Sequence, residues 1–146
     1  MSLSDNIMAQ IKDAMKAKDQ DRLAALRAIK SELLLIQTSG AESSEEGELK
    51  MLQKLVKQRK DSAELYTSQN RPDLADPELF QANVISEFLP AQMSDEELTA
   101  EIKKIIENTG ASGMADMGKV MGMASKALAG RADGKSISIK VKALLA

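Results

Sequence analysis

The residues best suited to chemistry in this sequence are cations and glycines near its C-terminus. On a helical wheel at 100° per residue, the segment that begins at Asp116 separates into an apolar band and a band of small residues. The small band contains Gly118, Gly122, Ser125 and Ala129, with Lys119 and Lys126 beside it. Because glycine costs a helix interior about 1 kcal/mol relative to alanine, two glycines on one face indicate that something approaches the backbone closely.

Two interpretations of this small band stay open. The favoured one is close packing of a neighbouring helix, and the other is close approach of a nucleic-acid backbone, with cations contacting its phosphates. Charge supports the second, since residues 110–146 carry a net charge of +4 and residues 1–90 a net charge of −3. The candidate nucleic-acid-binding residues are therefore Gly118, Lys119, Gly122, Lys126, Arg131, Lys135, Lys140 and Lys142. Aromatic residues make up only 2% of the chain, so a base-stacking platform is not expected.

A search for catalytic groups finds no candidate. The chain has no cysteine, histidine or tryptophan, which excludes disulfides, thiolate and imidazole chemistry and nearly all zinc sites. It has no Gly-x-Ser-x-Gly, no Ser-x-x-Lys and no phosphate-binding glycine loop. Acidic clusters such as Asp95 to Glu97 fit the first turns of helices better than acid–base work. We therefore expect no catalytic residue, metal site or cofactor.

Helices are expected throughout the chain to position these residues. Starts are predicted after Ser4, after Asp19, at Ser43 with Glu46 in capping-box spacing, at Asp76 before Pro77, and at Ser94 with Glu97. Expected ends lie near Ser39, Gln69 and Gly110, and the fourth helix should end before Pro90. The segment 136–142 alternates like a strand. We favour a helix there because Ile137, Val141 and Leu144 share one face and a lone strand would lack a partner.

The predicted fold is all-α. The best boundary lies between Phe88 and Met93, which separates two groups of independently capped helices. This predicts an N-terminal helical domain over 1–91, with four helices and long hairpins, and a C-terminal three-helix bundle over 92–146.

Two further cationic features lie in the expected third helix. Lys50, Lys54 and Lys57 form one band, for which a solvated face is the favoured interpretation over a second basic site. Arg59 falls inside the apolar face. It could pair with a core carboxylate, which is favoured, or the face could be half-buried, or the guanidinium could point at a partner molecule.

The longest aliphatic run, 33–36, is far shorter than the ~20 apolar residues that span a bilayer. The residues after Leu3 are mostly polar or charged, so no signal peptide is expected and a cytoplasmic location is the default.

With these motifs in view, the chain resembles the YqeY-like family (GatB/YqeY domain) of small helical proteins. The matching stretches are 14–19, 26–31, 57–62, 89–98, 116–121 and 130–134. The family is similar to the C-terminal tail of the GatB component of the aspartyl/glutamyl-tRNA amidotransferase. Residues shared with that tail are Gly118, Lys119, Met121, Gly130 and Ala132. Asp133-Gly134 replaces the tail's usual Asn-Pro helix start, and Asp133 can cap a helix as Asn does.

The resemblance implies a role in binding tRNA, while the chemical steps of the amidotransferase take place elsewhere in that enzyme. A carbon–nitrogen ligase activity with glutamine as amido-N-donor is what the resemblance implies for the larger enzyme. We do not expect this chain to carry out that reaction. The leading hypothesis is a non-catalytic module that binds tRNA or docks on a tRNA-handling complex. The alternative is a protein-interaction adaptor whose N-terminal hairpin docks on a partner, and a self-sufficient enzyme comes third.

Overall fold

The computed structural model describes residues 2–39 and 44–146, and within these ranges the regular structure is helical. The predicted all-α class is therefore confirmed. By contacts, the chain forms two compact units, Met1–Leu89 and Pro90–Ala146.

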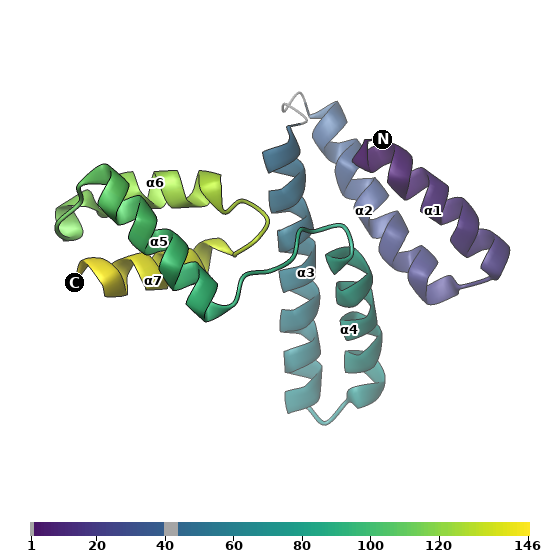
Figure 1. The fold of residues 1–146 in the computed structure, drawn as a ribbon. Coiled ribbons are helices and arrows are strands. Elements are labelled where there is room, and N and C mark those ends of the chain that lie inside the picture. Colours follow the sequence, from purple (N-terminus) through teal and green to yellow (C-terminus); the bar gives the residue numbers. More distant parts are fainter. Residues whose placement is uncertain (1, 40–43) are drawn as a thin grey trace. The chain divides into compact units, whose positions relative to one another are not determined.

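The N-terminal unit consists of two helical hairpins, each visible as a pair of neighbouring helices (Figure 1). Its helices are α1 (Leu3–Ala17), α2 (Gln20–Thr38), α3 (Glu45–Ser68) and α4 (Pro72–Ser86). The first hairpin turns at Lys18, whose left-handed φ of 56° ends α1, and Asp19 then caps α2. Helix α2 also packs against α4 and α3. The core of this unit includes Ile7, Leu26, Ile29, Leu52 and Ile85, each almost completely buried.

Three helix starts in this unit differ from the prediction. Helix α1 begins at Leu3 with Ser2 as its cap, and not after Ser4. Ser44 caps α3 and its hydroxyl accepts a hydrogen bond from the Gly47 amide, whereas the predicted cap, Ser43, lies outside the described residues. Helix α4 begins at Pro72, so the predicted start at Asp76 is wrong and Pro77 lies inside the helix. Pro72 already supplies the favourable proline at the first helical position. Pro77 removes only the bond to the Asp73 carbonyl, in an exposed turn where water can replace it.

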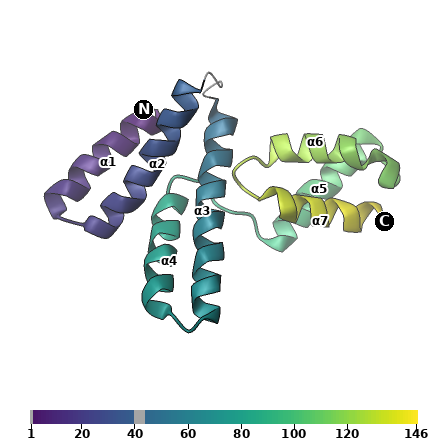
Figure 2. The same cartoon turned by 180° about the vertical axis from the view of Figure 1, so that it is seen from behind.

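The C-terminal unit contains α5 (Asp95–Thr109), the 3₁₀ turn η1 (Met114–Asp116), α6 (Met117–Ala127) and α7 (Gly134–Leu145). In Figure 2, α6 and α7 run beside each other and α5 packs across both. The predicted capping box of Ser94 and Glu97 opens α5, and Gly110, with φ at 69°, ends it. The segment 136–142 is helical, as favoured from its periodicity. The unit has its own core, in which Ile102, Val120, Leu128, Ile137 and Val141 are almost fully buried.

Candidate nucleic-acid interface

Helix α6 presents the predicted glycines and lysines to solvent. Its inner face buries Val120 and Ala124 completely, and its outer face exposes Gly118, Lys119, Gly122 and Lys126. The two lysines are seven residues apart, which is two helical turns or about 10 Å along the axis. They therefore form one stripe along α6.

The two glycines of this face do not serve packing within their own unit. Apart from its chain neighbours and the nearby backbone of α6 itself, a Cβ atom built at Gly118 or at Gly122 meets no described atom within 4 Å. The favoured prediction, close packing of a neighbouring helix on the small band, is therefore wrong for Gly118 and Gly122, while Ser125 and Ala129 of the same band are half-buried. The space above both glycines is open.

Helix α7 carries a second stripe with the same spacing. Asp133 caps the helix through a 2.6 Å hydrogen bond accepted from the Ser136 amide, so the aspartate does replace the usual asparagine. Ile137 and Val141 face the core, while Lys135 and Lys142, also seven residues apart, are exposed.

Lys140 does not belong to this second stripe. It follows Lys135 by five residues and thus lies about 140° further around the helix. Its Nζ atom lies 2.8 Å from Oδ1 of Asp95 on α5, and its side chain is only 20% exposed, whereas that of Asp95 is 81% exposed. The structure therefore separates Lys140 from the other predicted phosphate contacts and gives it a carboxylate partner.

The loop between α6 and α7 is fixed by the segment that leads into α5. Gly130 is buried with φ at 77°, a conformation that favours glycine, and its carbonyl accepts a 2.7 Å hydrogen bond from Nε2 of Gln92. The Met93 amide donates to the Arg131 carbonyl at 3.0 Å. These bonds hold the backbone of Arg131 while its side chain extends into solvent.

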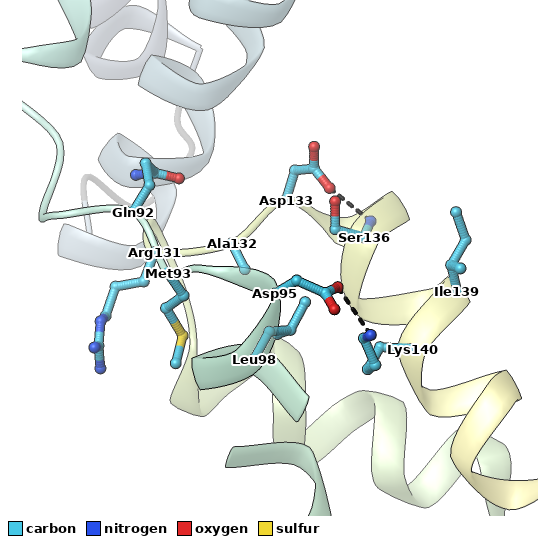
Figure 3. A pocket seen from close by; sticks show the side chains of 10 residues that line it. All are labelled: Gln92, Met93, Asp95, Leu98, Arg131, Ala132, Asp133, Ser136, Ile139 and Lys140. Carbon is cyan, nitrogen blue, oxygen red and sulfur yellow. Dashed lines mark hydrogen bonds and ion pairs between the residues drawn. The ribbon is translucent and has the colours of Figure 1, made fainter. Parts of the chain in front are cut away.

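A cavity of about 350 Å³ opens beside this loop (Figure 3). Its lining residues come from the segment before α5, the start of α5, the loop and α7: Gln92, Met93, Asp95, Leu98, Arg131, Ala132, Asp133, Ser136, Ile139 and Lys140. In Figure 3 the Lys140 side chain points toward Asp95, and the Arg131 side chain extends away from this pair. Sequence reasoning identified Arg131 and Lys140 but missed the pocket, because its other walls come from residues some forty positions earlier.

The exposed cations of α6, α7 and the α6–α7 loop differ in their ion pairing from the lysine band of α3. Within residues 2–39 and 44–146, the ion pairs include none made by Lys119, Lys126, Arg131, Lys135 or Lys142. On α3, by contrast, Lys50 pairs with Glu46 and Lys57 with Asp61. This supports the favoured interpretation of the α3 band as a solvated face.

Arg59 has an amide partner in place of the expected core carboxylate. Its Nε donates to Oε1 of Gln81 on α4 at 3.1 Å, and its NH1 group donates to the Leu55 carbonyl at 3.1 Å. The side chain is half-buried, so neutral oxygen acceptors and contact with water can satisfy the guanidinium donors. The favoured prediction of a carboxylate partner is wrong.

The part of the chain that the structure describes offers neither a metal site nor a membrane-spanning helix. There, the Asp and Glu side chains form no group of three or more that could hold a metal ion. No helix in that part has both the length and the apolar character to cross a bilayer. At the start of α4, the exposed Arg71 guanidinium donates a hydrogen bond to Asp73 and lowers the pKa of that carboxyl.

Comparison with known proteins gives matches over nearly the whole chain. The family model described as Yqey-like protein matches residues 4–145. A relative from Clavispora lusitaniae, named altered inheritance of mitochondria protein 41, mitochondrial, is 31% identical over 69% of this chain and 61% of its own length. A protein of the same name from Pyrenophora tritici-repentis is 26% identical over 93% of this chain and 77% of its own length.

These comparisons confirm the family that the sequence motifs indicated, and they correct one expectation. Both relatives are named as mitochondrial proteins, which overturns the default of a cytoplasmic location. That default rested on composition and on the polar N-terminal residues, and neither feature identifies a compartment. The chain spans about three fifths of the length of the first relative.

Proposed function

The chain belongs to the YqeY-like family, and from this premise we propose that it is a helical module that binds tRNA through its C-terminal unit. Lys119 and Lys126 on α6, Lys135 and Lys142 on α7, and Arg131 between them contact phosphates. Gly118 and Gly122 let the RNA backbone approach α6. The observation that carries the proposal is the pair of exposed lysine stripes, whose members have no carboxylate partner in the described structure.

Physical chemistry supports a phosphate ligand for these stripes. Protein–RNA affinity comes largely from cations that neutralise phosphates and release counterions. Exposed lysines seven residues apart repeat about every 10 Å along a helix, which is a spacing that can follow a phosphate backbone. The resemblance to the tail of the tRNA-dependent amidotransferase supports tRNA over other nucleic acids, and it also supports association with amidotransferase-type machinery.

The experiment is fluorescence anisotropy of labelled bulk tRNA with the full chain. The test variant carries Lys119→Glu, Lys126→Glu and Arg131→Glu, and we expect it to lose binding with unchanged helical circular dichroism. The matched control carries Lys54→Glu, Lys60→Glu and Arg27→Glu, which change the net charge equally on exposed positions of the N-terminal unit. Equal loss in both variants would mean that total charge, and not this surface, governs binding. Binding that persists in the test variant would refute the assigned surface.

A second candidate function is favoured by a different observation. The N-terminal hairpin exposes the large apolar side chains of Met8, Met15, Leu34 and Leu35, and such side chains can form a protein-binding surface when they are grouped. On this view the chain is an adaptor and its lysines are merely solvated. A protein partner that remains bound after nuclease treatment, and is released by Leu34→Ser with Leu35→Ser, would support the adaptor.

The proposal assigns no reaction to this chain, and a carbon–nitrogen ligase activity remains the property of the larger enzyme that it resembles. Amide formation from glutamine by the purified chain would contradict this. The relatives' names support mitochondria over the cytoplasm as its location.

We further propose that residues 1–91 form a four-helix domain and residues 92–146 a three-helix bundle that folds alone. A fragment over 92–146 with native-like amide shifts would support this division, and an unfolded fragment would refute it.

A further inference from the structure

The pocket beside the α6–α7 loop contains a cation that is poorly matched to its partner. The side chain of Lys140 is only 20% exposed, so an anion beside its ammonium is favourable. The anion it has, the Asp95 carboxylate, is 81% exposed and gains little from a pair that water can replace. Asp95 can therefore turn into solvent at small cost if another anion takes its place on Lys140.

The same pocket also has an apolar wall. Ile139 is 60% exposed because it lies two residues, or about 200° around α7, beyond the buried Ile137, and Leu98 and Met93 line the cavity with it. Ser136, which lies next to Asp133 in Figure 3, adds a hydroxyl to the lining of the pocket. A ligand that suits these walls has an apolar face and an anionic group.

The size of the cavity limits the ligand to a small group. A volume of about 350 Å³ lies at the lower end of the range of small-ligand sites. One nucleotide combines a phosphate with a flat base whose faces are apolar and whose edges are polar, and single-stranded RNA is commonly recognised through bases splayed out of the stack. The C-terminus of a peptide with an apolar last residue has similar chemistry. The exposed Arg131 at the pocket and the lysine stripes on α6 and α7 favour RNA, since they can contact the flanking phosphates.

We propose that this pocket takes one unstacked nucleotide of the bound RNA, with the phosphate on Lys140 in place of the Asp95 carboxylate and the base against Ile139. The inference rests on the proposed RNA-binding function and adds a site to it. The Asp95 carboxylate takes the place of the phosphate on Lys140 when no ligand is bound, and the ligand must displace this carboxylate. The unusual consequence is that removing this carboxylate should tighten binding.

The test uses the full chain and adenosine 5′-monophosphate, followed by NMR chemical shifts, with inorganic phosphate and adenosine as separate probes. Asp95→Asn should bind the mononucleotide roughly two- to fivefold more tightly, since an exposed ion pair is worth up to about 1 kcal/mol. Lys140→Gln should bind it at least about tenfold more weakly, because a charge-assisted contact to phosphate is lost. The shifts should fall on Ser136, Ile139 and Leu98.

Two matched controls separate the pocket from general charge. Glu96→Gln alters the net charge by the same amount as Asp95→Asn, one residue further along the first turn of α5, and Lys103→Gln removes an exposed lysine outside the pocket. Both should leave mononucleotide affinity within twofold of the parent. Tightening in Glu96→Gln equal to that in Asp95→Asn would overturn the displacement idea.

The outcomes distinguish this inference from the function on which it rests. If tRNA binds but the mononucleotide does not bind even to Asp95→Asn, the pocket inference fails and the proposed function stands. If a peptide carboxylate shifts the pocket residues and the mononucleotide does not, the nucleotide assignment is refuted. Loss of tRNA binding in Lys119→Glu with Lys126→Glu, while the mononucleotide still binds, would support two separate contacts.

Discussion

Replacing Gly122 by alanine should stabilise the protein and weaken its binding to RNA. The residue lies in the middle of α6 (Met117–Ala127), where glycine costs about 0.8–1 kcal/mol relative to alanine. A Cβ atom there meets nothing within 4 Å, so no steric cost offsets this gain. Gly118 lies in the first turn of α6, where replacement by alanine should give a smaller stabilisation.

A stabilisation of about 1 kcal/mol corresponds to about fivefold slower hydrogen exchange of the α6 amides that open with the C-terminal unit. We would measure exchange by NMR, because the chain has no tryptophan for a fluorescence probe. Gly130→Ala is the opposing control. Its φ of 77° places the new side chain in a conformation that costs about 1–2 kcal/mol, so exchange should become faster.

The same Gly122→Ala variant tests the reason for the glycine. If RNA approaches α6 closely, the added methyl group should weaken tRNA binding although the protein is more stable. Faster exchange in Gly122→Ala would refute the reasoning, because it would mean that some part of the molecule occupies the space above α6. Slower exchange with unchanged tRNA affinity would remove the glycines from the proposed interface.

Further predictions concern the exposed ion pair of α4 and the capping box of α5. Arg71 lowers the pKa of Asp73, so the contribution of this pair to stability is complete at neutral pH and is lost as pH falls through that lowered pKa. In an NMR titration, Arg71→Gln should raise the pKa of Asp73 toward its ordinary value. An unchanged pKa would contradict the pairing. Ser94→Ala should destabilise the C-terminal unit by about 1 kcal/mol, seen as faster α5 exchange, whereas unchanged exchange would show that Glu97 and water replace the cap.

The helices could be predicted from the sequence mainly where their ends carry local signals. Ser94 with Glu97, Gly110 and Asp133 act on their own backbone neighbours, so the sequence around them contains the whole interaction. The predicted start of α4 was wrong because Pro72 and Pro77 both fit the preference for proline at the first helical position. Only the packing of the full helix distinguishes the two. The helical state of 136–142 followed from the buried face of Ile137 and Val141.

The candidate site was less predictable because its defining contacts join distant residues. Asp95 looked like a capping acid, and nothing near it in sequence identifies Lys140 as its partner. The pocket needs the backbone bonds from Gln92 and Met93 to the α6–α7 loop, which periodicity does not reveal. The small band was visible in the sequence, but only the structure shows that no neighbour packs on its two glycines, Gly118 and Gly122.

The central claim is that phosphates bind the lysine stripes of the C-terminal unit, and a salt titration of tRNA binding tests it most directly. Four phosphate contacts predict that the logarithm of the affinity falls with the logarithm of salt concentration with a slope of about −3 to −4. The triple variant with Lys119→Glu, Lys126→Glu and Arg131→Glu should lose binding at every salt concentration. No tRNA binding by the parent chain at low salt, or binding without salt dependence, would contradict the account.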